Sequence, residues 1–127
     1  MYMGDNSKIK QYRHENGTWI RTLDYMQQEN VYLKNRLAEI VRDKLEQTLL
    51  EQVEYFQNNF LNKDAVIALL RHDIATESQG INTQWTNDNI DLDWLAKHER
   101  LRVDMSKMEK EFSRLKFEFN KYLSEIL

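Results

Sequence analysis

The chain of 127 residues contains no cysteine and no proline, and it has only three glycines. Average usage would supply about six prolines in this length. Without cysteine there is no disulfide, no thiolate nucleophile and no cysteine metal site. Proline and glycine are the main interrupters of regular structure, so their scarcity, together with abundant Leu, Glu, Lys, Gln and Arg, predicts long α-helices.

Long apolar runs and strongly basic stretches are also missing. No run of apolar residues is long enough to cross a bilayer, and the first residues lack the apolar core of a signal peptide. The net charge is −3, and no segment is basic enough to follow a phosphate backbone. We therefore expect a cytoplasmic protein whose partner is neither a membrane nor a nucleic acid.

The C-terminal third carries a regular stripe of mostly apolar residues. Its members follow one another in alternating steps of four and three: Trp94, His98, Leu101, Met105, Met108, Phe112, Leu115, Phe119, Tyr122 and Ile126. This heptad spacing places the side chains on one narrow face of an α-helix, which only another helix covers well. We predict that this stripe, the seam, is the surface through which the protein packs and interacts.

Two further patterns surround the seam. Basic and acidic residues recur every seven positions beside it: Arg100, Lys107, Arg114 and Lys121, and then Asp104, Glu111, Glu118 and Glu125. With His98 at heptad position a, the acidic set occupies g and the basic set occupies c, and a seam flanked by one sign of charge favours a specific helix partner in a specific orientation. Solvated ion pairs that serve solubility are an equal alternative. Val103 and Phe117 lie opposite the seam and predict a second contact surface, covered either by a third helix or by another subunit.

The first half of the chain predicts a polar arm followed by one or two helices. Residues 1–17 form the arm, because Asn16-Gly17 is a turn signal and the residue after it can cap a helix. From Trp19 the four–three spacing predicts a helix over 18–61. Weak helix formers near residue 62 favour a break before a second helix over 64–78. The apolar spacing continues through them, so a single helix over 18–78 is an equal alternative.

Gly80 and its polar neighbours predict a loop over 79–90, with Trp85 as an apolar anchor against the end of the bundle. The last helix is expected over 91–126, with Thr86, Asn87 or Asn89 as candidates for its N-cap.

Residues 18–127 are therefore expected to form a single helical domain with an elongated, all-α fold. It is either an antiparallel helical hairpin or a three-helix bundle with coiled-coil-like packing. An unbroken first helix would leave part of its apolar stripe in water, which favours a homodimer, a four-helix bundle made of two hairpins. A break near residue 62 would instead favour a monomeric three-helix bundle.

The motifs that carry known chemistries are absent. The histidines lack the Glu-x-x-His spacing of di-iron bundles and the His-Glu-x-x-His spacing of zinc proteases. There is no glycine-rich phosphate loop and no Gly-x-Ser-x-Gly turn, and the acidic stretch at 87–93 lacks the glycine and glutamate of a calcium loop. We expect no catalytic residues, no bound metal and no cofactor.

These features predict a non-enzymatic structural or protein-interaction module that acts through helix–helix docking, with itself or with another helical protein. His98, the one polar member of the seam, is interpreted as a buried residue that fixes helix register. The alternative is a ligand- or metal-binding helical bundle that uses His98 or His72.

Overall fold

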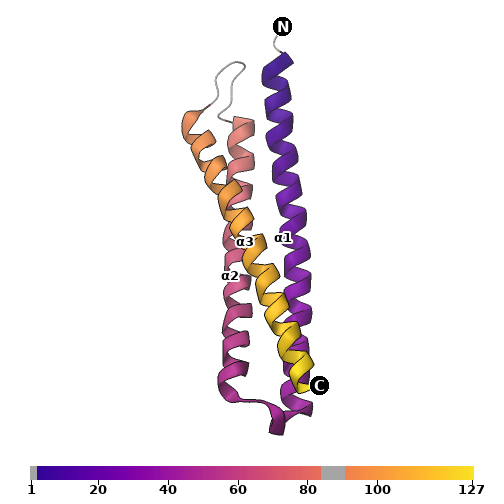
Figure 1. Ribbon diagram of the computed structural model, residues 1–127. Helices are drawn as coiled ribbons and strands as arrows, with labels where there is room; N and C mark the ends of the chain where they lie inside the picture. Colours follow the sequence, from indigo (N-terminus) through magenta and orange to yellow (C-terminus); the bar gives the residue numbers. More distant parts are fainter. Residues whose placement is uncertain (1–2, 84–90) are drawn as a thin grey trace.

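The computed structural model describes the backbone of residues 3–83 and 91–127 and the side chains of residues 8–81 and 91–127. Within these residues the chain is entirely helical apart from its connections. Helix α1 (Met3–Asp43) is followed by a short 3₁₀ turn, η1 (Leu45–Gln47), and then by α2 (Leu50–Thr83) and α3 (Leu92–Ile126). Together they form an elongated bundle in which α2 runs antiparallel to the other two helices (Figure 1). The all-helical prediction is confirmed, and the bundle has the three-helix form.

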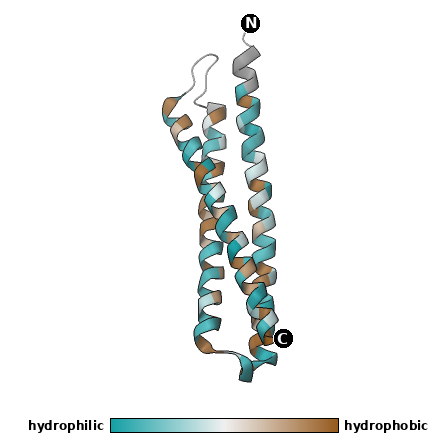
Figure 2. Cartoon of the chain, in the orientation of Figure 1, coloured by the Kyte–Doolittle hydropathy of each residue, from teal (hydrophilic) through white to brown (hydrophobic). Residues whose placement is uncertain are grey.

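The core runs the length of the bundle. Apolar residues recur along each helix between polar ones, which is the pattern of a helix that buries one face (Figure 2). The seam of α3 lies in this core: its members from Trp94 to Tyr122 are all buried, and Ile126 is partly buried. They pack against apolar residues of the other two helices: Trp19, Leu23, Met26, Leu33 and Leu37 of α1, and Phe56, Phe60, Ile67, Leu70 and Ile74 of α2. The seam is thus covered within the same chain.

The chain reverses direction at residues 44–49, and α2 continues unbroken through Asn62. Both sequence predictions for this region are therefore wrong: the break near Asn62 and the single helix over 18–78. No glycine or proline marks the reversal; Lys44 leaves the helical conformation, and Thr48 is extended with its hydroxyl donating to the carbonyl of Leu45 at 2.9 Å. Asn59 stays helical, with its amide donating to the carbonyl of Tyr55 at 2.8 Å. Packing of α2 against both neighbours outweighs the weak helix propensity of the asparagines.

Helix α1 begins at Met3, so the helix replaces the predicted arm of residues 1–17. Asn16, which we expected in a turn, is buried and donates its amide to the hydroxyl of Ser78 in α2 at 3.1 Å. Gly17 has a helical backbone with no positive φ. Asn16 and Gly17 do not form a turn, because the helical conformation allows α1 to make contacts along the end of α2.

The loop was predicted to begin at residue 79, but α2 continues to Thr83 and Ile81 is buried. The predicted start of the loop is therefore wrong. Trp85, Thr86, Asn87 and Asn89 lie outside the described residues. Asp91 is the N-cap of α3: its carboxylate accepts from the backbone N–H groups of Asp93 at 2.9 Å and Trp94 at 3.4 Å. None of the helices in the described part of the chain combines the length and apolarity needed to cross a bilayer.

Candidate functional site

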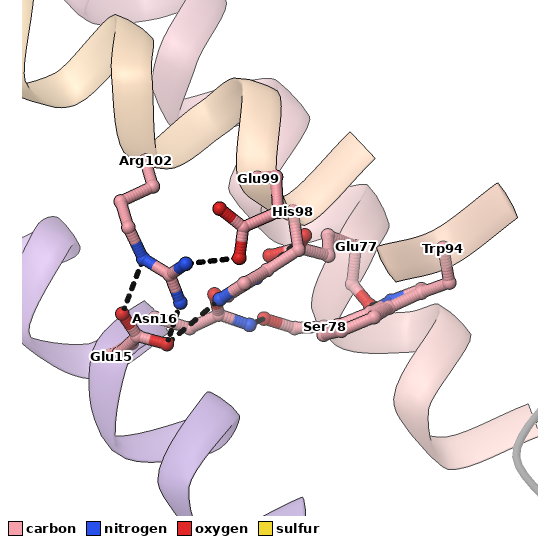
Figure 3. A network of polar contacts seen from close by, with 8 residues as sticks. All are labelled: Glu15, Asn16, Glu77, Ser78, Trp94, His98, Glu99 and Arg102. Carbon is pink, nitrogen blue, oxygen red and sulfur yellow. Dashed lines mark hydrogen bonds and ion pairs between the residues drawn. The ribbon is translucent and has the colours of Figure 1, made fainter. Parts of the chain in front are cut away.

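A buried polar network joins the three helices at the end of the bundle where α3 begins (Figure 3). His98 of α3 is fully buried between two carboxylates. Its Nδ1 lies 2.8 Å from Oε1 of Glu77 in α2, and its Nε2 lies 2.9 Å from Oε1 of Glu15 in α1. A doubly protonated imidazole donates to both of these acceptors at once. One side chain therefore ties α3 to both neighbouring helices.

Arg102, one turn further along α3, closes the network on the solvent side. Its Nε donates to Oε2 of Glu15 at 3.1 Å and its Nη2 donates to Oε1 at 2.9 Å, a bidentate pair. Its Nη1 also pairs with Glu99. These bonds hold the pKa of the Arg102 guanidinium well above its usual range.

The network shifts two further pKa values in opposite directions. Burial alone would lower the pKa of His98, but its hydrogen bonds to Glu77 and Glu15 outweigh burial, and the pKa is raised. Burial alone would raise the pKa of Glu15, but the bonds from Arg102 and His98 outweigh it, and the pKa is lowered. The arrangement favours an imidazolium held between carboxylates.

Aromatic rings enclose the imidazole. Trp94 stacks on His98, with the ring centroids 4.9 Å apart and the ring planes at 12° to each other. The rings of Trp19 and Tyr12 in α1 also contact the imidazole, at centroid distances of 4.8 and 4.7 Å. The indole of Trp94 donates to the backbone carbonyl of Glu77 at 2.9 Å. Both imidazole nitrogens are occupied, so His98 fits the predicted role of fixing register better than a role as a metal ligand.

Sequence reasoning missed Glu15 and Glu77, although a signal for one of them was present. Glu77 continues the spacing of Ile67, Leu70 and Ile74, which marks it as a core position. Glu15 lay in the segment assigned to the arm. Among the described residues, no group of three or more His, Cys, Asp or Glu side chains is placed to hold a metal ion.

A second feature is the face of α2 that points away from both neighbouring helices. Every exposed residue between 57 and 79 is uncharged: Gln57, Asn58, Leu61, Asn62, Ala65, Ala68, Leu69, His72, Ala75, Thr76 and Gln79. Leu61 and Leu69 are 53% and 59% exposed. Charged residues make up 31% of the whole chain, so their absence along this stretch distinguishes the surface, which we name the outer α2 face.

Two shallow grooves between α1 and α2 border the outer α2 face. One, of about 400 Å³, is lined by apolar residues together with two cations and a glutamine: Lys34, Leu37, Ala38, Val41, Arg42, Val53, Gln57, Phe60 and Leu61. The other, of about 560 Å³, has a lining that combines apolar and charged residues: Gln27, Val31, Lys34, Asp64, Ile67, Ala68, Arg71, His72 and Ala75. Small alanine side chains allow another helix to approach closely, since the distance between helix axes depends on the residues at the contact.

The second contact surface predicted from the sequence is exposed. Val103 and Phe117 of α3 are 65% and 71% exposed, and no helix within the described residues covers them. They lie fourteen positions apart, about 21 Å along the helix. Lys107, Lys110 and Arg114 occupy the exposed surface between them. The exposed residues between them also include Ser106, Glu109 and Ser113, so the two apolar side chains are separated by polar and charged residues.

Comparisons of the chain with protein-family models, with curated proteins and with solved structures found no match. Its function must be inferred from its own geometry. That geometry offers a buried network whose imidazole nitrogens are both engaged, and an uncharged exposed face on α2.

Proposed function

We propose that the protein is a non-enzymatic interaction module that docks a helix of its partner onto the outer α2 face and the adjoining α1–α2 grooves. The observation that carries the proposal is the lack of any charged residue among the exposed positions of α2 from 57 to 79. Charged residues are depleted at the centres of protein interfaces, where desolvating them is costly. A helix face that is exposed only to water tolerates charged residues, so their absence is unexplained unless the face is covered.

The docking surface differs from the one that the sequence predicted. The seam is buried against α1 and α2 of its own chain, so it is not free to bind a partner. The outer α2 face offers leucines and alanines beside two grooves, and a helix laid in such a groove is a common mode of recognition.

The outer face of α3 is a weaker candidate for the same role. Burying Phe117 against a partner helix would also desolvate Lys110 and Arg114 beside it, and each buried charge needs a paired acid in the partner. The exposed residues of the outer α2 face carry no such cost, and the charged residues that line the adjoining grooves already have ion-pair partners: Lys34, Arg42, Asp64 and Arg71. The ligand- or metal-binding alternative lacks comparable support, because His98 bonds carboxylates through both ring nitrogens and His72 belongs to no metal-binding group in the described residues.

The proposal is tested by photo-crosslinking in the protein's own cells. A benzophenone side chain at Ala65, in the middle of the outer α2 face, should give a discrete adduct of defined mass. The same group at Lys110, on the outer face of α3, is the positional control and should give little. An adduct from position 110 with none from position 65 would contradict the proposal.

A matched pair of double variants separates docking from folding. Leu61→Glu with Leu69→Glu should abolish the adduct at Ala65 while the melting temperature stays close to that of the wild type, because both leucines are more than half exposed. Val103→Glu with Phe117→Glu makes the same chemical change at similarly exposed positions and should leave the adduct intact. Loss of the adduct in both pairs would show that the crosslink does not report this face.

A further inference from the structure

We infer that the helix docked on the outer α2 face is α2 of a second copy of the same chain, running antiparallel, with the two-fold axis at Ala65. This rests on the proposed function and names its partner. The inference comes from two properties of the exposed residues of α2: their order along the helix and their lack of charge.

The leucines and one pair of polar residues of the outer α2 face are placed symmetrically about Ala65, whereas the residues three positions to either side, Asn62 and Ala68, differ. Leu61 and Leu69 stand four positions to either side, and Asn58 and His72 stand seven to either side. In an antiparallel pair centred at Ala65, each Leu61 therefore meets Leu69 of the other copy. The two alanines meet at the axis, where their small side chains let the helices approach closely.

The polar residues also match in this register. Asn58 meets His72 of the second copy, an amide opposite an imidazole that can exchange a hydrogen bond with it. Further out, Glu54 meets Thr76, and the acid is not placed against another acid. The contact thus has an apolar centre and a polar rim, as stable interfaces do.

Charge explains why this face suits a second copy and the outer face of α3 does not. A two-fold interface brings the same patch of each subunit together, so any charge near its centre meets its own kind. The outer α2 face has no exposed charged residue between positions 57 and 79, so two copies of it do not repel each other. A two-fold contact of the outer face of α3 centred at Lys110 would bring the two copies of that lysine together and would place Lys107 and Arg114 of both chains in the same interface.

The expected affinity is modest. The stripe from Asn58 to His72 extends about 21 Å, and a contact of this length falls at the lower end of specific interfaces. We expect half-dissociation at a concentration on the order of 10 µM. Light scattering or sedimentation of the purified full chain should show a shift from monomer to dimer over that range, and a monomer at every concentration up to about 1 mM would overturn the inference.

A charge swap tests the register. Leu61→Lys alone and Leu69→Glu alone should each weaken the dimer at least about tenfold, because each places an unpaired charge against a leucine. The double variant sets the new ammonium at position 61 against the new carboxylate at position 69 of the other copy, on both sides of the axis, and should recover most of the affinity. The two positions are eight apart on one helix and do not pair within a chain. A double variant no tighter than the single ones would overturn the antiparallel register.

The absence of natural cysteine gives a second, independent test. Oxidation of Ala65→Cys should link two chains efficiently, because a residue on the two-fold axis lies opposite itself at disulfide distance. Lys110→Cys is the matched control and should link poorly. Efficient linkage at 110 with none at 65 would overturn the placement of the axis.

Failure of the inference is distinguishable from failure of the proposed function. In cells, the adduct formed at Ala65 should have twice the mass of the chain. An adduct of another mass, with a purified protein that remains monomeric, would overturn the second copy as partner and leave docking on this face in place. No adduct from Ala65 together with a monomeric purified protein would overturn both.

Discussion

The two ends of the bundle are held together by different kinds of interaction. Where α3 begins, the helices are joined by the ion pairs of His98 with Glu15 and Glu77. Where α3 ends, they are joined by aromatic packing: Phe119 meets Phe60 at a centroid distance of 5.2 Å and an angle of 84°, and it meets Phe56 at 5.2 Å and 70°. Edge-to-face contacts of this kind are favourable for aromatic rings.

The difference shows that one bundle uses burial for stability and polar contacts for register. The aromatic rings gain free energy largely from the area they bury, which does not depend on pH. The His98 network costs desolvation and leaves buried acceptors without a hydrogen-bond partner among the described residues, Oε2 of Glu77 and Oδ1 of Asn16. We expect it to fix the axial alignment of α1, α2 and α3 at that end, because His98 reaches both Glu15 and Glu77 only when the helices are in this register.

The largest expected effect lies at the aromatic end. Phe119→Ala removes a fully buried ring and should lower the free energy of unfolding by about 3–5 kcal/mol, measured by denaturant titration. Phe117→Ala is the control, with the same change two residues away at an exposed position, and should cost less than about 0.5 kcal/mol. Equal losses from the two variants would contradict the orientation of α3.

A smaller effect, with a distinctive pH dependence, is expected at the His98 end. Glu77→Gln keeps an acceptor for His98 but removes a charge, and it should cost about 1–2 kcal/mol near pH 6. In the wild type, the pKa of His98 is higher in the folded than in the unfolded chain, so the folded chain binds more protons. This stability is complete below the ordinary value of about 6.5 and is lost as the pH rises through the raised pKa.

The titratable groups that face His98 are Tyr12 and Glu15 from α1, Glu77 from α2 and, through Glu15, Arg102 from α3. Removing the charge of Glu77 should therefore flatten the fall of melting temperature as the pH rises above about 6.5. Glu111→Gln, which removes the acid paired with Lys63 in the middle of the bundle, should leave that slope unchanged. The same slope in both variants would remove His98 as its source.

The smallest effect concerns a buried hydroxyl of the aromatic end. The hydroxyl of Tyr122 is buried with no hydrogen-bond partner among the described residues, and burial raises its pKa. Tyr122→Phe should stabilise the protein by roughly 0.5–1 kcal/mol, read as a higher melting temperature. Tyr55→Phe removes a hydroxyl that donates to Glu118 at 2.7 Å and should not stabilise. A clear loss on Tyr122→Phe would mean that its hydroxyl is bonded.

The seam was predictable because heptad spacing is a local property of one helix. Its members from Trp94 to Phe119 recur with the period of a helix face, and that is enough to place them in a core. The reversal at 44–49 was not predictable, because Leu45 and Leu49 continue the apolar pattern and yet are exposed. The residues there do not forbid a helix, and the turn forms because folding back buries Phe56 and Phe60.

The candidate sites divide in the same way. His98 was identified as a polar core residue, whereas its partners Glu15 and Glu77 lie 83 and 21 positions away along the chain. The outer α2 face has no positive motif in the sequence. Its lack of charge depends on which residues of α2 are exposed, because Asp64, Arg71 and Asp73 lie in the same stretch of sequence but are partly covered in the fold.

The sequence by itself determined that this protein is helical, which face of its last helix is buried, and that the common catalytic motifs are absent. These follow from composition and periodicity, which act over one or two turns of helix. The tertiary structure decided where the chain turns back, which carboxylates enclose His98, and which surface stays free. Those outcomes depend on contacts between residues distant in sequence, and local propensities, at under about 1 kcal/mol per residue, are too weak to oppose them.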